Sequence, residues 1–261
     1  MTPEQIPDIS ITNDYGRKVL DLVTRMGQTL LLNGAEIARV QTTMEMVAKA
    51  YNKDEIDVFA ISNGIFVTLR HEDKTRCTQI KHVPLHSPNL GKVAMINQLS
   101  REIVASKISL DDALSKMDEI VNAPAISLPL AMSASALGAA CFCYLLGGNL
   151  YDSLATLSIG VILCVCQYVM RLGKLSKMLQ TILGSVLVTL CGFLLSSLFP
   201  ILNMDNMIIG GLIILVPGVP FTTSIRDFFN GDYLSGTIRM IDAILVAFCM
   251  AIGVGLVYMI F

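Results

Sequence analysis

Residue types that could bind a small charged solute cluster around an interrupted apolar segment in the last quarter of the chain. The apolar run at 208–216 is broken by Pro217, Gly218 and Pro220. A proline inside a helix removes a backbone donor and clashes with the preceding turn, at a cost of about 3 kcal/mol. At membrane depth such a break is tolerated where it is buried in protein or lines a wet cavity, and transporters hold their substrates at breaks of this kind. The break therefore predicts a solute-binding site.

Hydroxyl and charged side chains follow the break and open the last apolar segment. They are Thr222, Thr223, Arg226, Asp227, Arg239 and Asp242. A zwitterion needs one anion and one cation, which these residues could supply, and an ionisable group within a membrane span is a functional candidate by default. For Asp227 and Asp242 we expect a role in substrate binding or proton coupling. Two structural alternatives remain: Arg239 and Asp242 are three residues apart and could pair on one helix, and the arginines could only anchor the spans.

The segment between these two apolar runs is rich in turn residues. It contains Gly231, Asp232, Ser235 and Gly236. We expect a loop that could act as a gate.

Composition places the chain among membrane proteins. It has 261 residues, of which 53% are hydrophobic and 15% charged, with a mean hydropathy of +0.63, too apolar for a soluble protein of this length. Residues 1–125 carry 14 Lys/Arg and 16 Asp/Glu, whereas residues 126–261 carry five of each. The near balance of charge in both halves gives nucleic acid no basic surface to bind.

The polar first half predicts a small cytosolic α+β domain at 14–122, after a disordered lead at 1–13. Apolar spacing indicates helices over 14–32, 35–51, 90–105 and 110–120, and alternation indicates strands over 56–61, 64–70 and 75–81. Asn63-Gly64 is a hairpin signal between the first two strands.

The second half, 123–261, predicts five transmembrane helices. We place them at 126–147, 151–170, 178–199, 206–225 and 240–261, each of membrane length. Arg171, Lys174 and Lys177 lie between the second and third spans, while Arg226 and Arg239 flank the loop between the fourth and fifth. The positive-inside rule then predicts a cytoplasmic N-terminus and a C-terminus outside. We expect a multi-pass protein of the plasma (inner) membrane.

Small residues recur every four positions in two of the spans. They are Ala131, Ser135, Ala139 and Cys143 in the first, and Ala243, Ala247, Ala251 and Gly255 in the fifth. Such faces let membrane helices approach closely, either within the chain or against a second membrane subunit.

We expect neither a metal nor a cofactor. Cys141 and Cys143, two residues apart, point to different faces of a helix, and thiols in apolar helices usually serve as small packing residues. His71, His82 and His86 lie in or near strands and a proline-containing loop, which does not fit a helical zinc site. The sequence has no G-x-x-x-x-G-K-[ST] motif for ATP.

Three segments together resemble the threonine/serine exporter family of bacterial and fungal membrane proteins. They are LLNGAEIARVQTTMEMVAKAYN, DVFAISNGIFVTL and LVPGVPFTTSIRDFFNGDYLSGTIRMIDA, and the resemblance extends from about residue 15 to the end. It implies export of small amino acids such as threonine and serine, or of dicarboxylates such as succinate, coupled to protons. Full-length members have about ten spans, so this chain resembles the larger subunit of the split form of the family. In that form a shorter membrane protein supplies the remaining spans. Assembly into a higher oligomer is a further possibility.

The resemblance also includes Gly34, Glu36 and Arg39 in the soluble half. Glu36 and Arg39 are three residues apart, so an ion pair within one helix is the default expectation. The soluble domain of the family has been compared to hydrolases, but no G-x-S-x-G or H-E-x-x-H motif occurs here. Three hypotheses follow: a non-enzymatic exporter subunit, which we favour, a membrane-anchored hydrolase, and a regulatory subunit of a transporter.

Overall fold

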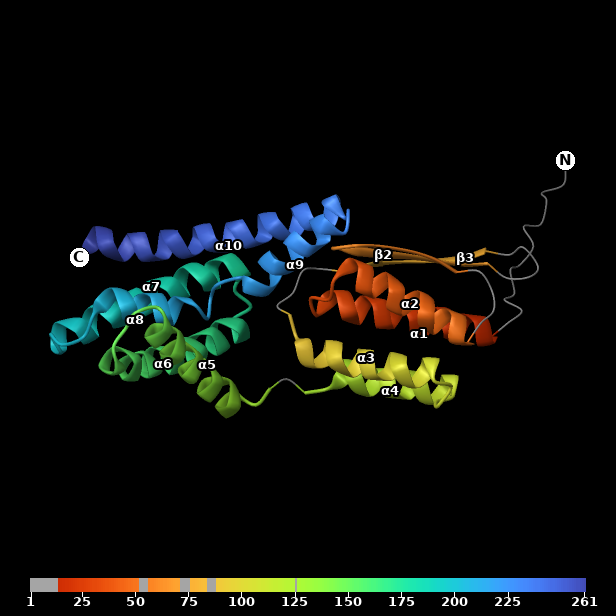
Figure 1. Cartoon of the computed structure of the whole chain (residues 1–261), viewed down its shortest axis with the longest axis horizontal. Helices are drawn as coiled ribbons and strands as arrows, with labels where there is room; N and C mark the ends of the chain where they lie inside the picture. Colours follow the sequence, from red (N-terminus) through yellow and green to blue (C-terminus); the bar gives the residue numbers. More distant parts are fainter. Residues whose placement is uncertain (1–13, 52–55, 71–75, 84–87, 125) are drawn as a thin grey trace. The chain divides into compact units, whose positions relative to one another are not determined.

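The computed structural model describes residues 14–51, 56–70, 76–83, 88–124 and 126–261. The expected lead at 1–13 lies outside these residues. The chain forms two compact units (Figure 1). Unit 1 comprises residues 1–123 and 222–239, and unit 2 comprises residues 124–221 and 240–261. The segment 222–239, which follows the proline break, therefore belongs with the N-terminal domain.

Unit 1 contains the α+β domain that the sequence predicts. Its helices are α1 (Asp14–Leu32), α2 (Ile37–Tyr51), α3 (Leu90–Val104) and α4 (Leu110–Asn122). Its strands are β1 (Ile56–Ile61), β2 (Gly64–Arg70) and β3 (Arg76–His82), antiparallel in the order β1-β2-β3. Ile61 pairs with Gly64, so a tight hairpin joins β1 and β2 at the Asn-Gly signal.

These elements form three layers, with α1 and α2 between the sheet and the α3–α4 pair (Figure 1). The apolar stripe of α1, including Leu22, Met26 and Leu30, is fully buried, as are Met44 of α2 and Ile65 of β2. Gly27 allows α1 and α2 to approach closely, because a Cβ there would lie 2.2 Å from the Met44 sulfur. The central layer thus carries the core of the unit.

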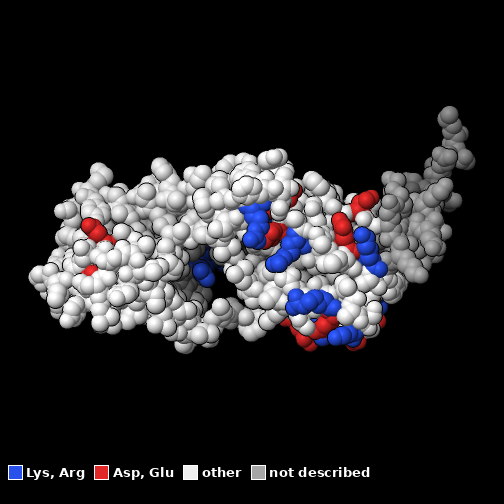
Figure 2. Space-filling model, viewed as in Figure 1, with Lys and Arg blue, Asp and Glu red and all other residues white. Residues whose placement is uncertain are grey.

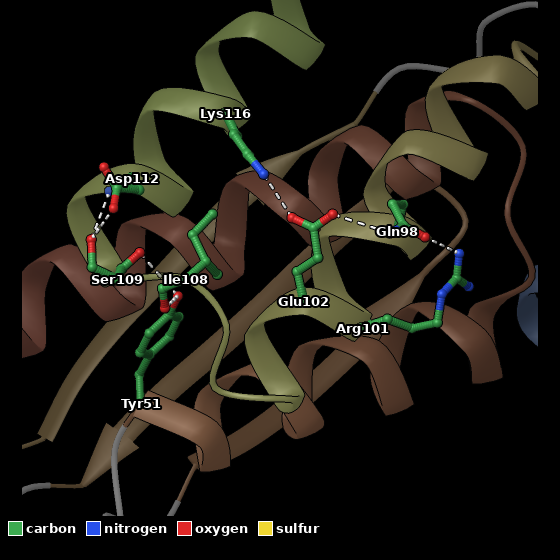
Figure 3. A network of polar contacts seen from close by, with 8 residues as sticks. All are labelled: Tyr51, Gln98, Arg101, Glu102, Ile108, Ser109, Asp112 and Lys116. Atoms are coloured by element: carbon green, nitrogen blue, oxygen red, sulfur yellow. Dashed lines mark hydrogen bonds and ion pairs between the residues drawn. The ribbon is translucent and has the colours of Figure 1, made fainter.

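Polar contacts brace the outer layer (Figure 3). Lys116 of α4 donates to Glu102 of α3 at 2.7 Å, and this hydrogen bond lowers the pKa of the Glu102 carboxyl. The Tyr51 hydroxyl reaches the carbonyls of Ile108 and Ser109, each at 3.2 Å, in the α3–α4 connection. Burial, followed by the charges of neighbouring groups, raises the pKa of Tyr51 to about 12, so this contact keeps its proton at neutral pH.

The membrane half contains α5 (Leu128–Leu145), α6 (Leu150–Leu172), α7 (Lys177–Leu198) and α8 (Met204–Leu212). Two further helices continue from one unit into the other, α9 (Gly218–Phe229) and α10 (Tyr233–Ile260). Among the described residues, α5, α6, α7 and α10 are long and apolar enough to cross a membrane. Charged side chains are correspondingly sparse in this half (Figure 2). The chain is an α-helical membrane protein, as predicted.

The stretch proposed as the fourth span, 206–225, is divided between α8 and the start of α9. The helix stops at Leu212 and resumes at Gly218, beside Pro217, so the break that the sequence predicts is present. Neither piece reaches the 18 residues of the candidate spans. A fifth crossing built from both pieces stays a prediction.

Small residues place the helices of unit 2 in close contact. A Cβ at Gly160 would lie 2.7 Å from the Ser135 carbonyl oxygen, and one at Gly210 would lie 2.5 Å from the Cys143 side chain. The Ser135 hydroxyl also donates to the Gly160 carbonyl at 2.9 Å. The small face of α5 is therefore used for packing within the chain.

The small face of α10 is used differently. Ala243 is buried, but Ala247 and Ala251 are exposed, and a Cβ at Gly255 would meet no atom within 4 Å. Within the described chain, this part of the face is open.

Replacing Gly34 by alanine should destabilise unit 1. Gly34 has φ +88°, and its Cβ would lie 2.8 Å from the Pro88 side chain. The backbone conformation alone costs an alanine about 1–2 kcal/mol, and the contact adds to that. We expect Gly34→Ala to lower the thermal unfolding midpoint of the detergent-solubilised chain. Gly64→Ala is the control, because a Cβ there meets only ordinary contacts at 3.7 Å; equal midpoints for the two variants would contradict the prediction.

Candidate functional site

A buried ion pair joins the two helices that follow the proline break. Oδ2 of Asp227 in α9 lies 3.5 Å from Nη1 of Arg239 in α10, and the two side chains are 0% and 6% exposed. The pair forms because α9 and α10 are joined by a short turn, in which Gly231 has φ +84°. A Cβ at Gly236 would lie 2.8 Å from the Phe228 ring, so a small residue is also needed where the helices meet.

Two loops of the N-terminal domain close around this helical hairpin. The α1–α2 loop supplies the Ala35 carbonyl, which accepts a 2.8 Å hydrogen bond from Nη2 of Arg239. It also supplies Glu36, which forms an ion pair with Arg226. The β1–β2 turn supplies the Ser62 N–H, which donates to the Ser235 hydroxyl oxygen at 3.2 Å. We call the set of these residues the hairpin cluster: Ala35, Glu36, Ser62, Arg226, Asp227, Ser235 and Arg239.

The cluster has unused hydrogen-bonding capacity. Six buried side-chain nitrogen or oxygen atoms in the described part of the chain lack a hydrogen-bond partner, and four of them are in the cluster. These four are both carboxylate oxygens of Asp227, Nη1 of Arg239 and the Ser62 hydroxyl oxygen. Buried polar groups in native proteins are normally paired. Their concentration at one place indicates a site that receives another polar group.

The surroundings of Asp227 make its carboxyl easier to protonate than that of an ordinary aspartate. Burial is the largest influence and raises the pKa of the Asp227 carboxyl. The positive charge of Arg239 and the Ile37 amide at the start of α2 act in the opposite direction and are outweighed, while the negative charges of Asp232 and Glu36 add to the increase. A carboxyl with a raised pKa can exchange a proton closer to neutral pH than an ordinary aspartate can.

The structure replaces the ion pair that helical spacing led us to expect and a second pair that it offered as an alternative. Glu36 pairs with Arg226 and not with Arg39, whose side chain is exposed. Arg239 pairs with Asp227 and not with Asp242, which instead accepts a 2.6 Å hydrogen bond from Lys177 at the start of α7. In both cases a partner distant in sequence replaces the neighbour three residues away.

The remaining predicted site residues lie on α9 and around the α9–α10 turn. Pro217 directly precedes α9, and Gly218, Pro220, Thr222 and Thr223 lie in its first half. Thr222 is exposed and Thr223 is half-buried. Gly231 and Asp232 form the turn, while Ser235 and Gly236 are buried at the start of α10. Gly34 precedes Ala35 in the α1–α2 loop.

Three participants were not among the predicted site residues. Ala35 contributes a backbone carbonyl, which residue type does not reveal. Ser62 lies in a turn whose sequence signal indicates only a hairpin. Lys177 was considered only as a positive-inside residue. The available clue was that Lys177 and Asp242 each lie at the edge of an apolar run.

The described residues contain no group of three or more His, Cys, Asp or Glu placed to hold a metal ion. His71 and His86 lie outside the described residues. The charged groups of the hairpin cluster are two carboxylates, Glu36 and Asp227, and two guanidinium groups, Arg226 and Arg239, beside the hydroxyls of Ser62 and Ser235.

Comparison with known proteins identifies the family of the chain. A family model described as "Putative threonine/serine exporter" matches residues 21–261. The chain belongs to this family. The match covers both units, including every residue of the hairpin cluster.

Two curated relatives are longer than this chain. A "Probable threonine/serine exporter" of Mycobacterium tuberculosis is 27% identical over 249 residues, covering 92% of this chain and 46% of the relative. "Pheromone-regulated membrane protein 10" of Debaryomyces hansenii is 21% identical over 243 residues, covering 90% of this chain and 24% of the relative. The chain thus spans less than half of each relative. No solved structure matches it.

Removing one member of the buried pair should destabilise the protein more than removing both. Arg239→Met leaves a buried carboxylate without its cation, which costs about 3–5 kcal/mol. We expect a large fall in the thermal unfolding midpoint of the full chain, largely recovered in the double variant Asp227→Leu/Arg239→Met. Lys116→Met, which breaks the exposed contact to Glu102, is the control and should shift the midpoint little. A double variant less stable than Arg239→Met would contradict the pairing.

Proposed function

We propose that the chain is part of a secondary-active exporter of small polar metabolites, with the hairpin cluster as its substrate site. The observation that carries this proposal is the buried Asp227–Arg239 pair, in which Nη1 of Arg239 and both carboxylate oxygens of Asp227 make no full hydrogen bond. Its position supports the assignment, because Asp227 stands on the helix that begins at the proline break. Membership in a family named for threonine/serine export supports it further.

The pair suits the head group of an amino acid. Nη1 of Arg239 faces Asp227 at 3.5 Å and could turn to a carboxylate. The two oxygens of Asp227 make no full hydrogen bond and could accept from an ammonium group. A dicarboxylate could also bind at Arg239, provided that Asp227 is protonated, and burial moves its pKa in that direction. The other proposed contacts are Pro217, Gly218, Pro220, Thr222, Thr223, Arg226 and Asp242. Asp242 would first have to leave Lys177.

Proton coupling is proposed at the same carboxyl. A buried carboxyl whose pKa is raised changes protonation with its surroundings, and here its cation is a direct neighbour. Neutral Asp227 would release Arg239 to an anion, and ionised Asp227 would reclaim it. Competition of this kind links proton movement to substrate movement.

The proposed location is the plasma membrane, with the N-terminal domain in the cytoplasm and the C-terminus outside. Arg171 lies in the last turn of α6, Lys174 lies in the α6–α7 loop, and Lys177 begins α7. The α5–α6 loop and the 199–203 connection carry no Lys or Arg. This asymmetry supports the proposed orientation through the positive-inside rule.

A second membrane subunit is proposed to complete the transporter. The Mycobacterium tuberculosis relative has more than half its length beyond the matched region. The open small-residue face of α10 offers a place for another helix to approach closely.

Export should depend on Asp227. Cells lacking their own exporters would be loaded with threonine-containing dipeptides or grown to accumulate succinate. Efflux of these solutes would then be measured from cells that produce the chain alone, the chain with its partner, or the Asp227→Asn variant with the partner. We expect efflux from the pair, and at least a tenfold loss with Asp227→Asn, because the substituted side chain can neither carry a negative charge nor release a proton.

The matched control is Asp57→Asn, which changes an exposed carboxylate on β1 and should leave efflux unchanged. If a correctly inserted wild-type pair exports neither amino acids nor dicarboxylates, the export function is refuted. Undiminished efflux with Asp227→Asn would remove this residue from the mechanism.

Enlarging the open face of α10 should separate the subunits without unfolding the chain. Ala251→Leu places a larger side chain at an exposed position, so we expect co-purification with the partner to fall several-fold at an unchanged unfolding midpoint. Gly253→Leu is the contrasting control, because a Cβ there would lie 2.6 Å from the Ile182 carbonyl oxygen, and it should lower the midpoint. Full co-purification with Ala251→Leu would show that the partner binds elsewhere.

A further inference from the structure

Ser62 occupies an unusual place in the N-terminal domain. It stands in the tight turn between β1 and β2 and is only 2% exposed. Its backbone N–H donates to the Ser235 hydroxyl oxygen, but its own hydroxyl has no hydrogen-bond partner. Serine hydroxyls in turns commonly bond to neighbouring backbone groups. An alanine could make the same backbone contact, so the turn itself gives no reason for a serine here.

The Ser62 turn lies close to the charged pair. Its contact, Ser235, precedes Arg239 by one helical turn on α10, and residues so spaced share a face, with their Cβ atoms about 5–6 Å apart. Ala35 of the neighbouring loop contacts Arg239 itself. Ser62 and Asp227 therefore contact residues one helical turn apart on α10, Ser235 and Arg239.

The side chains of Ser62, Asp227 and Arg239 differ in the chemistry they can serve. The ammonium and carboxylate groups that Asp227 and Arg239 can bind are common to all amino acids, so this pair cannot tell one side chain from another. The Ser62 hydroxyl is neutral and can both donate and accept. A hydroxyl group on the solute would pair with it in either direction, whereas a methyl group would leave it buried and unpaired.

We propose that Ser62 is a specificity-determining residue, whose hydroxyl bonds to a side-chain hydroxyl of the transported solute. The inference rests on the proposed export function. It assigns the N-terminal domain a direct part in substrate recognition, through the tip of the β1–β2 hairpin. A site that bonds to a hydroxyl discriminates strongly against an isostere that lacks it, so threonine should be preferred to valine, which has nearly the same shape.

The test compares efflux of threonine and valine from cells that produce the chain together with its membrane partner. Both amino acids would be supplied as dipeptides, and initial efflux rates would be measured at matched internal concentrations. Ser62→Ala should reduce the threonine-to-valine ratio by about three- to tenfold, the effect of losing one hydrogen bond. Thr24→Ala is the matched control, because Thr24 also has a buried hydroxyl without a partner but lies in α1, more than two helical turns before the α1–α2 loop. It should leave the ratio unchanged.

The outcomes separate this inference from the proposal on which it rests. Wild-type cells that export neither amino acids nor dicarboxylates would refute export itself. Wild-type export of dicarboxylates alone would leave export standing and overturn the role of Ser62. The role is likewise overturned if Ser62→Ala leaves the ratio unchanged, or lowers both rates equally.

Discussion

Burial of the Asp227–Arg239 pair is the constraint that the other contacts of the hairpin cluster must satisfy. Removing two charges from water costs several kcal/mol for each ion, and mutual attraction offsets this only when the remaining polar atoms are also satisfied. Here the ions lie 3.5 Å apart and most of their hydrogen-bonding atoms are unpaired. The pair by itself is a poor way to stabilise a hairpin of two helices. Other contacts must hold it in place.

Those contacts come from the N-terminal domain. The Ala35 carbonyl, the Glu36 carboxylate and the Ser62 amide each bond to a different residue of the hairpin. Ala35 and Ser62 belong to loops at the ends of elements whose side chains form the core of the domain, so their positions are fixed by packing. The packed α+β domain thus supplies rigid contacts to a site whose chemical groups lie on α9 and α10. This explains why residues 222–239 group with the N-terminal domain rather than with the membrane helices that precede and follow them.

Local signals in the sequence predicted the elements but not the partners of the charged residues. Helical and alternating apolar spacing placed α1 to α4 and β1 to β3 within a few residues of their observed ends, and Pro217 placed the break before α9. The pairing of Arg226 with Glu36 joins residues 190 positions apart, and no periodicity reports such a contact. Spacing favoured Glu36–Arg39 and Arg239–Asp242, but pairs within one helix contribute only about 0.2–0.5 kcal/mol. Tertiary packing overrides a preference that small. Ser62 was missed for a related reason, because a turn signal describes the backbone and not the residue that the turn brings to α10.

The identity of residue 239 links the structural and chemical parts of the site. An arginine side chain presents its donors in a rigid planar fork, whereas a lysine presents one compact ammonium. Nη2 of Arg239 bonds to the Ala35 carbonyl, while Nη1 faces Asp227 without a full hydrogen bond. One arm therefore fixes the residue to the N-terminal domain, and the other stays available to an anion or to Asp227. Because the fork is rigid, the first contact orients the second. A lysine at this position could neutralise Asp227 but could not hold a fixed donor beside it, so the site requires the geometry of arginine and not only its charge.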